Sequence, residues 1–179
     1  MRNLKLTIAF DGSRYKGWQR LKNEERTIQG KLEETLSKIV GEPIALIGCG
    51  RTDAGVHAKE YVANFHTKST LLAEQILKSL RQFLPEDIAI LEVKEVEERF
   101  HARYGVKKKV YEYRVDTGAY RDVFARKYQF YLPELFDIEA MRRAGKVLVG
   151  THDFASFTSL KSKKKSTVRT LYDGIYPEN

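Results

Sequence analysis

One stretch of the sequence places an arginine and an aspartate between glycines, in a bend between two strand-like segments. Residues 50–58 read GRTDAGVHA. One interpretation is structural, because glycine permits tight turns and aspartate often hydrogen-bonds to nearby backbone. The other is chemical: the Arg51 guanidinium would keep the Asp53 carboxylate ionised. A positioned carboxylate can act as a nucleophile or a base.

A second stretch interleaves basic and aromatic residues. Residues 107–114 read KKKVYEYR, and strand alternation would put Lys107, Lys109, Tyr111 and Tyr113 on one face. A half-buried strand that begins with lysines is one explanation. The alternative is an aromatic platform for nucleobases, where each stacked base contributes roughly 1–3 kcal/mol. The residues alone leave both open.

The charge pattern favours a polyanionic partner. The chain of 179 residues has a net charge of +8. Residues 101–128 carry eight Lys/Arg against three acids, and lysines gather again at 161–165, whereas residues 85–99 are mainly acidic. Such segregation is expected of a face that contacts a phosphate backbone. A basic structural protein without an RNA role remains an alternative.

The composition excludes several classes of protein. At 42% hydrophobic residues the chain can bury a core, and a single cysteine, Cys49, rules out an internal disulfide and any multi-cysteine metal site. The apolar run at residues 4–10 is too short to span a membrane. We therefore expect a cytoplasmic protein without a membrane segment or a metal.

Hydrophobic periodicity predicts an α+β fold. Alternation indicates strands at residues 4–10 and 88–96, residues 44–49 indicate a short buried strand, and residues 56–67 indicate another, less regular one. Helical spacing indicates helices at 28–40, with Thr27 as N-cap and Gly41 as the stop, and at 71–83. The order β-α-β-β-α-β is that of a ferredoxin-like or RRM-like domain, which we assign to residues 1–103.

The remaining residues, 104–179, predict a second unit of the same type that is incomplete. A strand is expected at residues 106–115, a helix capped by Asp137 and closed by Gly150, and a strand at 168–176. A complete unit would need a further strand, helix and strand.

Five segments together resemble the tRNA pseudouridine synthases of the TruA type. They are FDGSRYKGWQ at residues 10–19, TIQ at 27–29, GRTDAGVHA at 50–58, KVYEY at 109–113 and GTHDFASF at 150–157. The resemblance runs along the whole chain, and the segment at 50–58 is highly specific.

The resemblance implies an isomerase that converts uridine to pseudouridine at positions 38, 39 and 40 of the tRNA anticodon stem-loop. It implies a homodimer that uses neither metal nor organic cofactor, with an active site between two ferredoxin-like domains. By the same resemblance, Asp53 is the catalytic nucleophile, Arg51 helps to extrude the target nucleotide, and Tyr111 stacks on the flipped uracil. Whether Asp53 attacks C1′, attacks C6 or removes a ribose proton stays open.

The resemblance also implies an arginine that pairs with the catalytic aspartate, in a glycine-rich block beyond the residues present. Nothing after Gly150 supplies that block. We therefore expect residues 1–179 alone to be inactive or severely impaired. The alternative function is a non-catalytic RNA-binding module, which shares the basic and aromatic features but has no need of Asp53.

Overall fold

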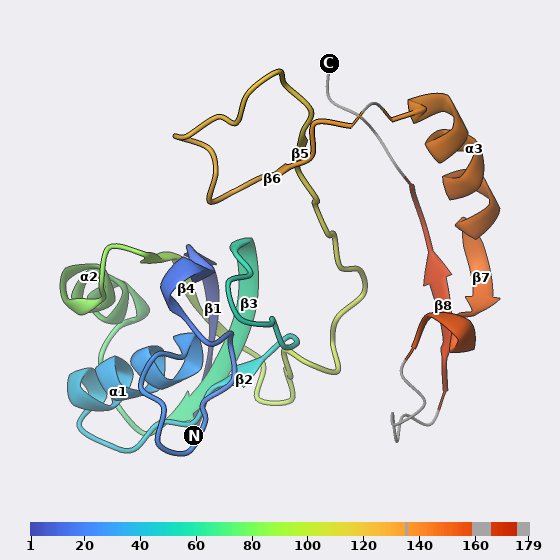
Figure 1. Ribbon diagram of the computed structural model, residues 1–179. Coiled ribbons are helices and arrows are strands. Elements are labelled where there is room, and N and C mark those ends of the chain that lie inside the picture. The colour runs from blue at the N-terminus through green and yellow to red at the C-terminus, as the bar shows by residue number, and fades with distance from the viewer. Residues whose placement is uncertain (135, 159–165, 175–179) are drawn as a thin grey trace. The chain divides into compact units, whose positions relative to one another are not determined.

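The chain folds into two compact units of mixed α and β structure. The computed structural model describes residues 1–134, 136–158 and 166–174, and divides the chain into unit 1, Met1–Glu112, and unit 2, Tyr113–Asn179 (Figure 1). The predicted α+β class is confirmed. Among the described residues, no helix is long and apolar enough to cross a membrane.

Unit 1 is built on a four-stranded antiparallel sheet. Its strands are β1 (Arg2–Phe10), β2 (Ile47–Gly48), β3 (Ala58–Thr67) and β4 (Ile88–Val96), in the order β2-β3-β1-β4. The alternation in β1 has the expected cause, because Leu4, Leu6 and Ile8 are fully buried on one face. Strand β2 is shorter than the predicted segment 44–49.

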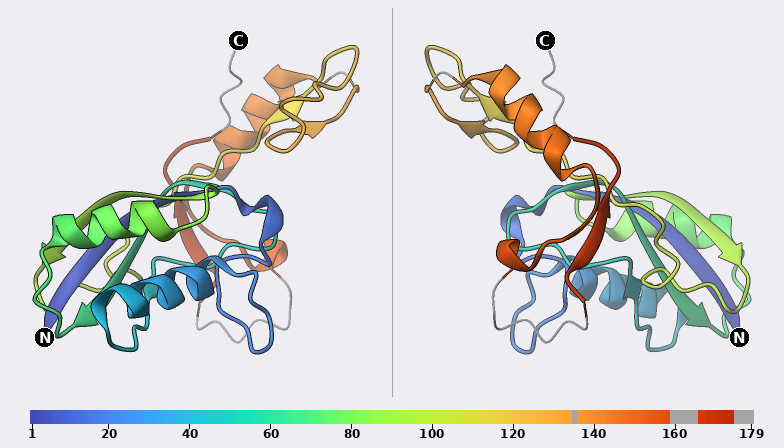
Figure 2. Two further views of the ribbon diagram at one scale, coloured as in Figure 1. Left: turned by 90° about the vertical axis from the view of Figure 1, so that its left-hand side faces the viewer. Right: turned by 90° about the vertical axis from the view of Figure 1, so that its right-hand side faces the viewer.

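Two helices cover one face of this sheet. Helix α1 (Ile28–Val40) and helix α2 (Ala73–Phe83) lie side by side against it, as Figure 2 shows. The predicted ends of α1 are confirmed: the Thr27 side chain accepts a hydrogen bond from the Gly30 N–H, and Gly41 adopts a left-handed conformation with φ 74°. The interface buries Leu32, Leu36 and, from α2, Leu80.

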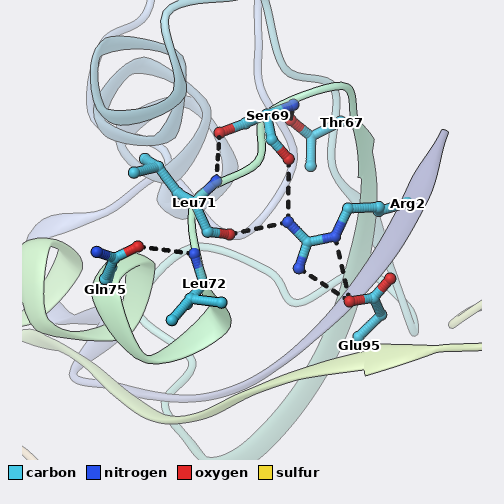
Figure 3. Close-up of polar contacts among 7 residues, drawn as sticks. All are labelled: Arg2, Thr67, Ser69, Leu71, Leu72, Gln75 and Glu95. Carbon is cyan, nitrogen blue, oxygen red and sulfur yellow. Dashed lines mark hydrogen bonds and ion pairs between the residues drawn. The ribbon is translucent and has the colours of Figure 1, made fainter.

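Arg2 connects the edge strand β4 to the segment just before α2 through hydrogen bonds (Figure 3). Its guanidinium donates to Glu95 on β4 and to the backbone carbonyls of Ser69 and Leu71, the latter at 2.8 Å. The Gln75 side chain then accepts from the Leu72 N–H at 2.8 Å, which satisfies a free donor at the helix start.

The described residues of unit 2 form two small sheets and one helix. Strands β5 (Val115–Asp116) and β6 (Phe130–Tyr131) pair in parallel, and β7 (Gly150–Asp153) pairs antiparallel with β8 (Val168–Leu171). Helix α3 (Ile138–Leu148) begins as predicted, because the Asp137 side chain accepts from the Ala140 N–H, and its C-cap is Val149. A 3-10 turn, η2 (Ala155–Phe157), follows β7.

The predicted strand at 106–115 is wrong over most of its length. Residues 106–114 form neither helix nor strand, and only Val115 enters β5. The alternation of side chains is present, but no neighbouring strand pairs with this segment within the described residues. A strand requires a hydrogen-bonding neighbour, which alternation does not provide. The lysines at 161–165, and residues 175–176 of the predicted last strand, lie outside the described residues.

Candidate active site

The loop that carries Arg51 and Asp53 joins β2 to β3 and packs on the loop after β1. We call residues 50–57 the 50–57 loop and residues 11–18 the 11–18 loop. The Trp18 N–H donates to the Thr52 carbonyl at 3.1 Å, and the Gly55 N–H donates to the Tyr15 carbonyl at 3.2 Å. These bonds hold the backbone on either side of Asp53.

Two glycines make this close approach possible. A Cβ at Gly12 would lie 2.0 Å from the Val56 carbonyl oxygen, and one at Gly17 would lie 2.3 Å from that of Thr52. Gly17 also has a φ of +94°, which residues with a side chain rarely adopt. The glycines in the segment at 10–19 therefore support the shape of the 50–57 loop.

The 11–18 loop is itself anchored by Asp87, in the turn before β4. The Tyr15 hydroxyl donates to Asp87 Oδ1 at 2.6 Å, the Arg14 guanidinium donates to Oδ2 at 2.6 and 2.9 Å, and the Asp11 N–H donates to the Asp87 carbonyl at 2.9 Å. Burial, reinforced by the hydrogen bond to Asp87, raises the pKa of Tyr15. The phenol therefore remains a proton donor at neutral pH.

An aromatic cluster supports the start of the 50–57 loop. The rings of Trp18 and Tyr61 stack with centroids 4.0 Å apart, and Phe10 lies 5.7 Å from Tyr61. The Tyr61 hydroxyl donates to the Gly50 carbonyl at 2.5 Å and accepts from the Gly50 N–H at 3.3 Å. A Cβ at Gly48 would lie only 2.2 Å from that hydroxyl. Burial raises the pKa of Tyr61, so it stays protonated.

Asp53 and Arg51 are both exposed on this supported loop. The backbone carbonyl of Asp53 accepts from the Val56 N–H at 3.2 Å, which closes a tight turn. Of the residues that the structure describes, none forms a hydrogen bond or ion pair with the Asp53 carboxylate. Asp53 and Arg51 therefore form no ion pair with each other in the described part of the chain, and the influence of Arg51 on the Asp53 carboxylate stays a prediction.

Tyr111 lies on the irregular segment after residue 105, and its side chain is 73% exposed. Contacts on both sides of it connect the segment to the 50–57 loop and to the sheet. A Cβ at Gly50 would lie 2.6 Å from Lys109 Nζ, and Lys59 on β3 pairs with Glu112 at 2.6 Å. The structure therefore brings this segment to the start of the 50–57 loop, but it places no direct contact between Tyr111 and Asp53.

A pocket of about 260 Å³ opens beside the same loop. Arg51 is part of its wall, whereas Asp53 and Tyr111 are not. Its lining comes from the end of the 11–18 loop and the residue after it, the start of α1, the region of β2, the start of the 50–57 loop and the segment after β4. The lining residues are Trp18, Gln19, Gln29, Leu46, Ile47, Gly48, Gly50, Arg51, His101, Arg103 and Tyr104.

None of the last three of these residues was predicted individually as a site residue. His101, Arg103 and Tyr104 begin the basic segment, which was the only available signal. The buried amides Asn3 and Asn64, which hold that segment against the sheet, gave no sequence signal. Asparagine is common in exposed turns, and its burial here follows from contacts that only the fold creates.

Comparisons with known proteins agree with the geometry. A profile described as tRNA pseudouridine synthase matches residues 6–105. The chain is 54% identical to tRNA pseudouridine synthase A 1 of Clostridium tetani over 96% of its own length and 70% of that relative. It is 49% identical to tRNA pseudouridine synthase A 2 of Bacillus cereus strain ZK over the same shares of the two chains. It is 45% identical to tRNA pseudouridine synthase A of Bacillus sp. strain KSM-64 over its whole length and 73% of the relative.

The profile spans more than half of the chain, and it includes the 11–18 loop, the 50–57 loop and the pocket. The relatives extend the similarity over nearly the whole chain. With the supported loop and its exposed aspartate, these matches establish that the chain belongs to the tRNA pseudouridine synthase family, a family of isomerases.

Proposed function

We propose that this protein converts uridine to pseudouridine at positions 38–40 of the tRNA anticodon stem-loop, with Asp53 as the nucleophile. The observation that carries the proposal is an exposed carboxylate on a loop whose backbone is held by hydrogen bonds at three positions. The 11–18 loop holds residues 52 and 55, and Tyr61 holds residue 50. A carboxylate with no partner among the described residues is available to a substrate, and a fixed backbone reduces the cost of orienting it.

The reaction needs what such a site can provide. The N1–C1′ bond breaks, the uracil rotates, and C5 bonds to C1′. C5 then loses its proton and N1 gains one, so the product is an isomer. Asp53 supplies the negative charge that engages the nucleoside, and it requires neither a metal nor an organic cofactor. Its attack at C1′, its attack at C6, and its action as a base are all compatible with this placement.

Arg51 and Tyr111 have proposed roles in holding the substrate. A paired base must leave its stack before it can react, at a cost of about a few kcal/mol. The planar guanidinium of Arg51 can contact phosphates and occupy the vacated space. The exposed ring of Tyr111 can stack on the detached uracil and still permit rotation in the plane of the ring.

Further parts of the proposal concern the whole protein. The sheet order β2-β3-β1-β4 with both helices on one face supports a ferredoxin-like first domain, proposed as residues 1–103, with 104–179 as a partial second domain. We also propose that the protein binds RNA, works as a homodimer and is cytoplasmic. The names of the relatives support tRNA as the substrate.

The substitution Asp53→Asn, made in the full-length protein, tests the proposal. It removes the charge but keeps the shape of the side chain. We expect pseudouridine formation to fall by at least about a thousandfold, as measured by tritium release from tRNA labelled at uridine C5, with tRNA affinity within a few-fold of the wild type. Glu60→Gln is the matched control, because Glu60 is an exposed acid nearby on β3.

Two outcomes would contradict the proposal. If Asp53→Asn retained activity, Asp53 would not be the nucleophile. If the full-length wild-type protein bound tRNA without forming pseudouridine, the alternative of a non-catalytic RNA-binding module would be supported instead.

A further inference from the structure

The pocket beside the 50–57 loop has the composition of an anion-binding site. Its wall contains two arginines, Arg51 and Arg103, together with His101 and the side-chain amide of Gln19. No carboxylate lines it among the described residues. Its volume is about 260 Å³, slightly below the roughly 300–1,000 Å³ of pockets that enclose a drug-sized ligand, so it can hold part of a nucleotide rather than enclose a whole one.

We propose that this pocket binds one unpaired nucleotide of the RNA substrate that flanks the target uridine. Arg103 contacts its phosphate, and Tyr104 stacks on its base. The proposal rests on the proposed function, and it adds a second nucleotide-binding position that is separate from Tyr111. Arg51 lines the pocket and lies two residues from Asp53, which places the bound nucleotide next to the target.

Tyr104 is an exposed ring on a rigid support. Its side chain is 82% exposed, although its ring stacks on His101 with centroids 4.3 Å apart and planes 28° apart. His101 Nδ1 accepts hydrogen bonds from the N–H groups of Arg103 and Tyr104, at 3.2 and 3.3 Å. The backbone just before is also fixed, since the Ala102 N–H donates to the buried Asn64 Oδ1 at 2.9 Å. An exposed aromatic face held in this way is the device by which proteins stack unpaired bases.

The opposite wall is also fixed. The Gln29 amide donates to the Leu46 carbonyl at 3.1 Å and to the buried Glu33 at 2.9 Å, and its oxygen accepts from the Arg20 N–H at 3.0 Å. A nucleotide entering the pocket therefore meets preformed walls on both sides. Preformed walls reduce the ordering cost of binding.

The test compares substitutions at the two proposed contacts. The readouts are the dissociation constant for unmodified tRNA as a function of salt, and the fluorescence of 2-aminopurine placed singly on either side of the target uridine. Arg103→Gln should reduce the steepness of the log–log salt dependence by about 0.7–0.9, the value for one phosphate contact. Tyr104→Ala should weaken binding by roughly 5- to 150-fold and abolish the fluorescence quenching at one flanking position, whereas Tyr104→Phe should preserve both.

Arg99→Gln is the matched control for charge. Arg99 is exposed four residues earlier, pairs with Glu97 at 2.8 Å and does not line the pocket. Its substitution should leave the salt dependence and the quenching unchanged.

The outcomes separate this inference from the proposed function. If Asp53→Asn abolishes pseudouridine formation while Arg103→Gln and Tyr104→Ala leave binding, salt dependence and quenching unchanged, the pocket proposal is overturned and the function stands. If Asp53→Asn stays active while the pocket variants lose quenching and affinity, the catalytic assignment fails and the nucleotide site is supported.

Discussion

The side-chain amide of Asn64 on β3 donates a hydrogen bond to Asn3 Oδ1 on β1 at 2.9 Å, between two residues that are almost completely buried. Both lie on the face of the sheet opposite the helices, where they act together on residues 97–102. Asn64 Oδ1 accepts from the Ala102 N–H, and Asn3 Nδ2 donates to the carbonyls of residues 97, 98 and 100. This pair directs the chain from β4 into the pocket.

Replacement of Asn64 by alanine should destabilise unit 1. It leaves the buried Ala102 N–H and the Asn3 oxygen without partners, and each such group costs roughly 1–3 kcal/mol. The free energy of unfolding, measured by urea denaturation, should therefore fall by at least roughly 1–3 kcal/mol, the cost of one such group. Thr7→Ala, on the same sheet face but half-buried, should change it by less than about 0.5 kcal/mol. Equal losses in the two variants would contradict a special role for the amide pair.

Gly17→Ala should displace the 50–57 loop. A Cβ there would lie 2.3 Å from the Thr52 carbonyl in a backbone with φ +94°. We expect both a loss of stability of about 1 kcal/mol or more and at least a tenfold loss of pseudouridine formation. The control is Gly41→Ala, where φ is +74° but nothing lies within 4 Å. It carries conformational strain without the clash, so it should lose stability and retain activity in the folded protein.

The stability of the protein should decline in alkali because of two buried phenols. Burial raises the pKa of Tyr61 and of Tyr15 in the folded state. Above pH of about 10 the unfolded chain releases these protons while the folded chain keeps them, so the free energy of unfolding falls as pH rises. Tyr61→Phe should make this decline shallower. Urea titrations at pH 8 to 11 measure it, with Tyr120→Phe, an exposed site, as the control. An identical pH dependence in Tyr61→Phe would show that this phenol does not contribute.

Substitutions at Tyr111 test stacking on the target base. Tyr111→Phe keeps the aromatic face and should retain most of the activity. Tyr111→Ala should lower kcat/KM by roughly 5- to 150-fold, the equivalent of about 1–3 kcal/mol. Tyr120→Ala, at an exposed tyrosine outside the 107–114 segment, is the control. Normal turnover by Tyr111→Ala would exclude stacking as the role of this residue.

The sequence by itself determined the local elements and the family. The burial of Leu4, Leu6 and Ile8 follows from alternation, and the ends of α1 follow from the preferences of Thr27 and Gly41. These features depend on neighbouring residues, so pattern reasoning could find them. The motif at 50–58 identified the candidate loop and the family for the same reason, since its residues are contiguous.

Only the tertiary structure decided which groups meet. Asn3 and Asn64 are 61 positions apart, and the sheet register brings them together. The same register decides which residues line the pocket with Arg51. Among the described residues, no strand pairs with residues 106–114, despite their alternation. Hydrogen bonds between distant residues depend on the whole chain path, so the amide pair and the pocket could not be predicted from local sequence.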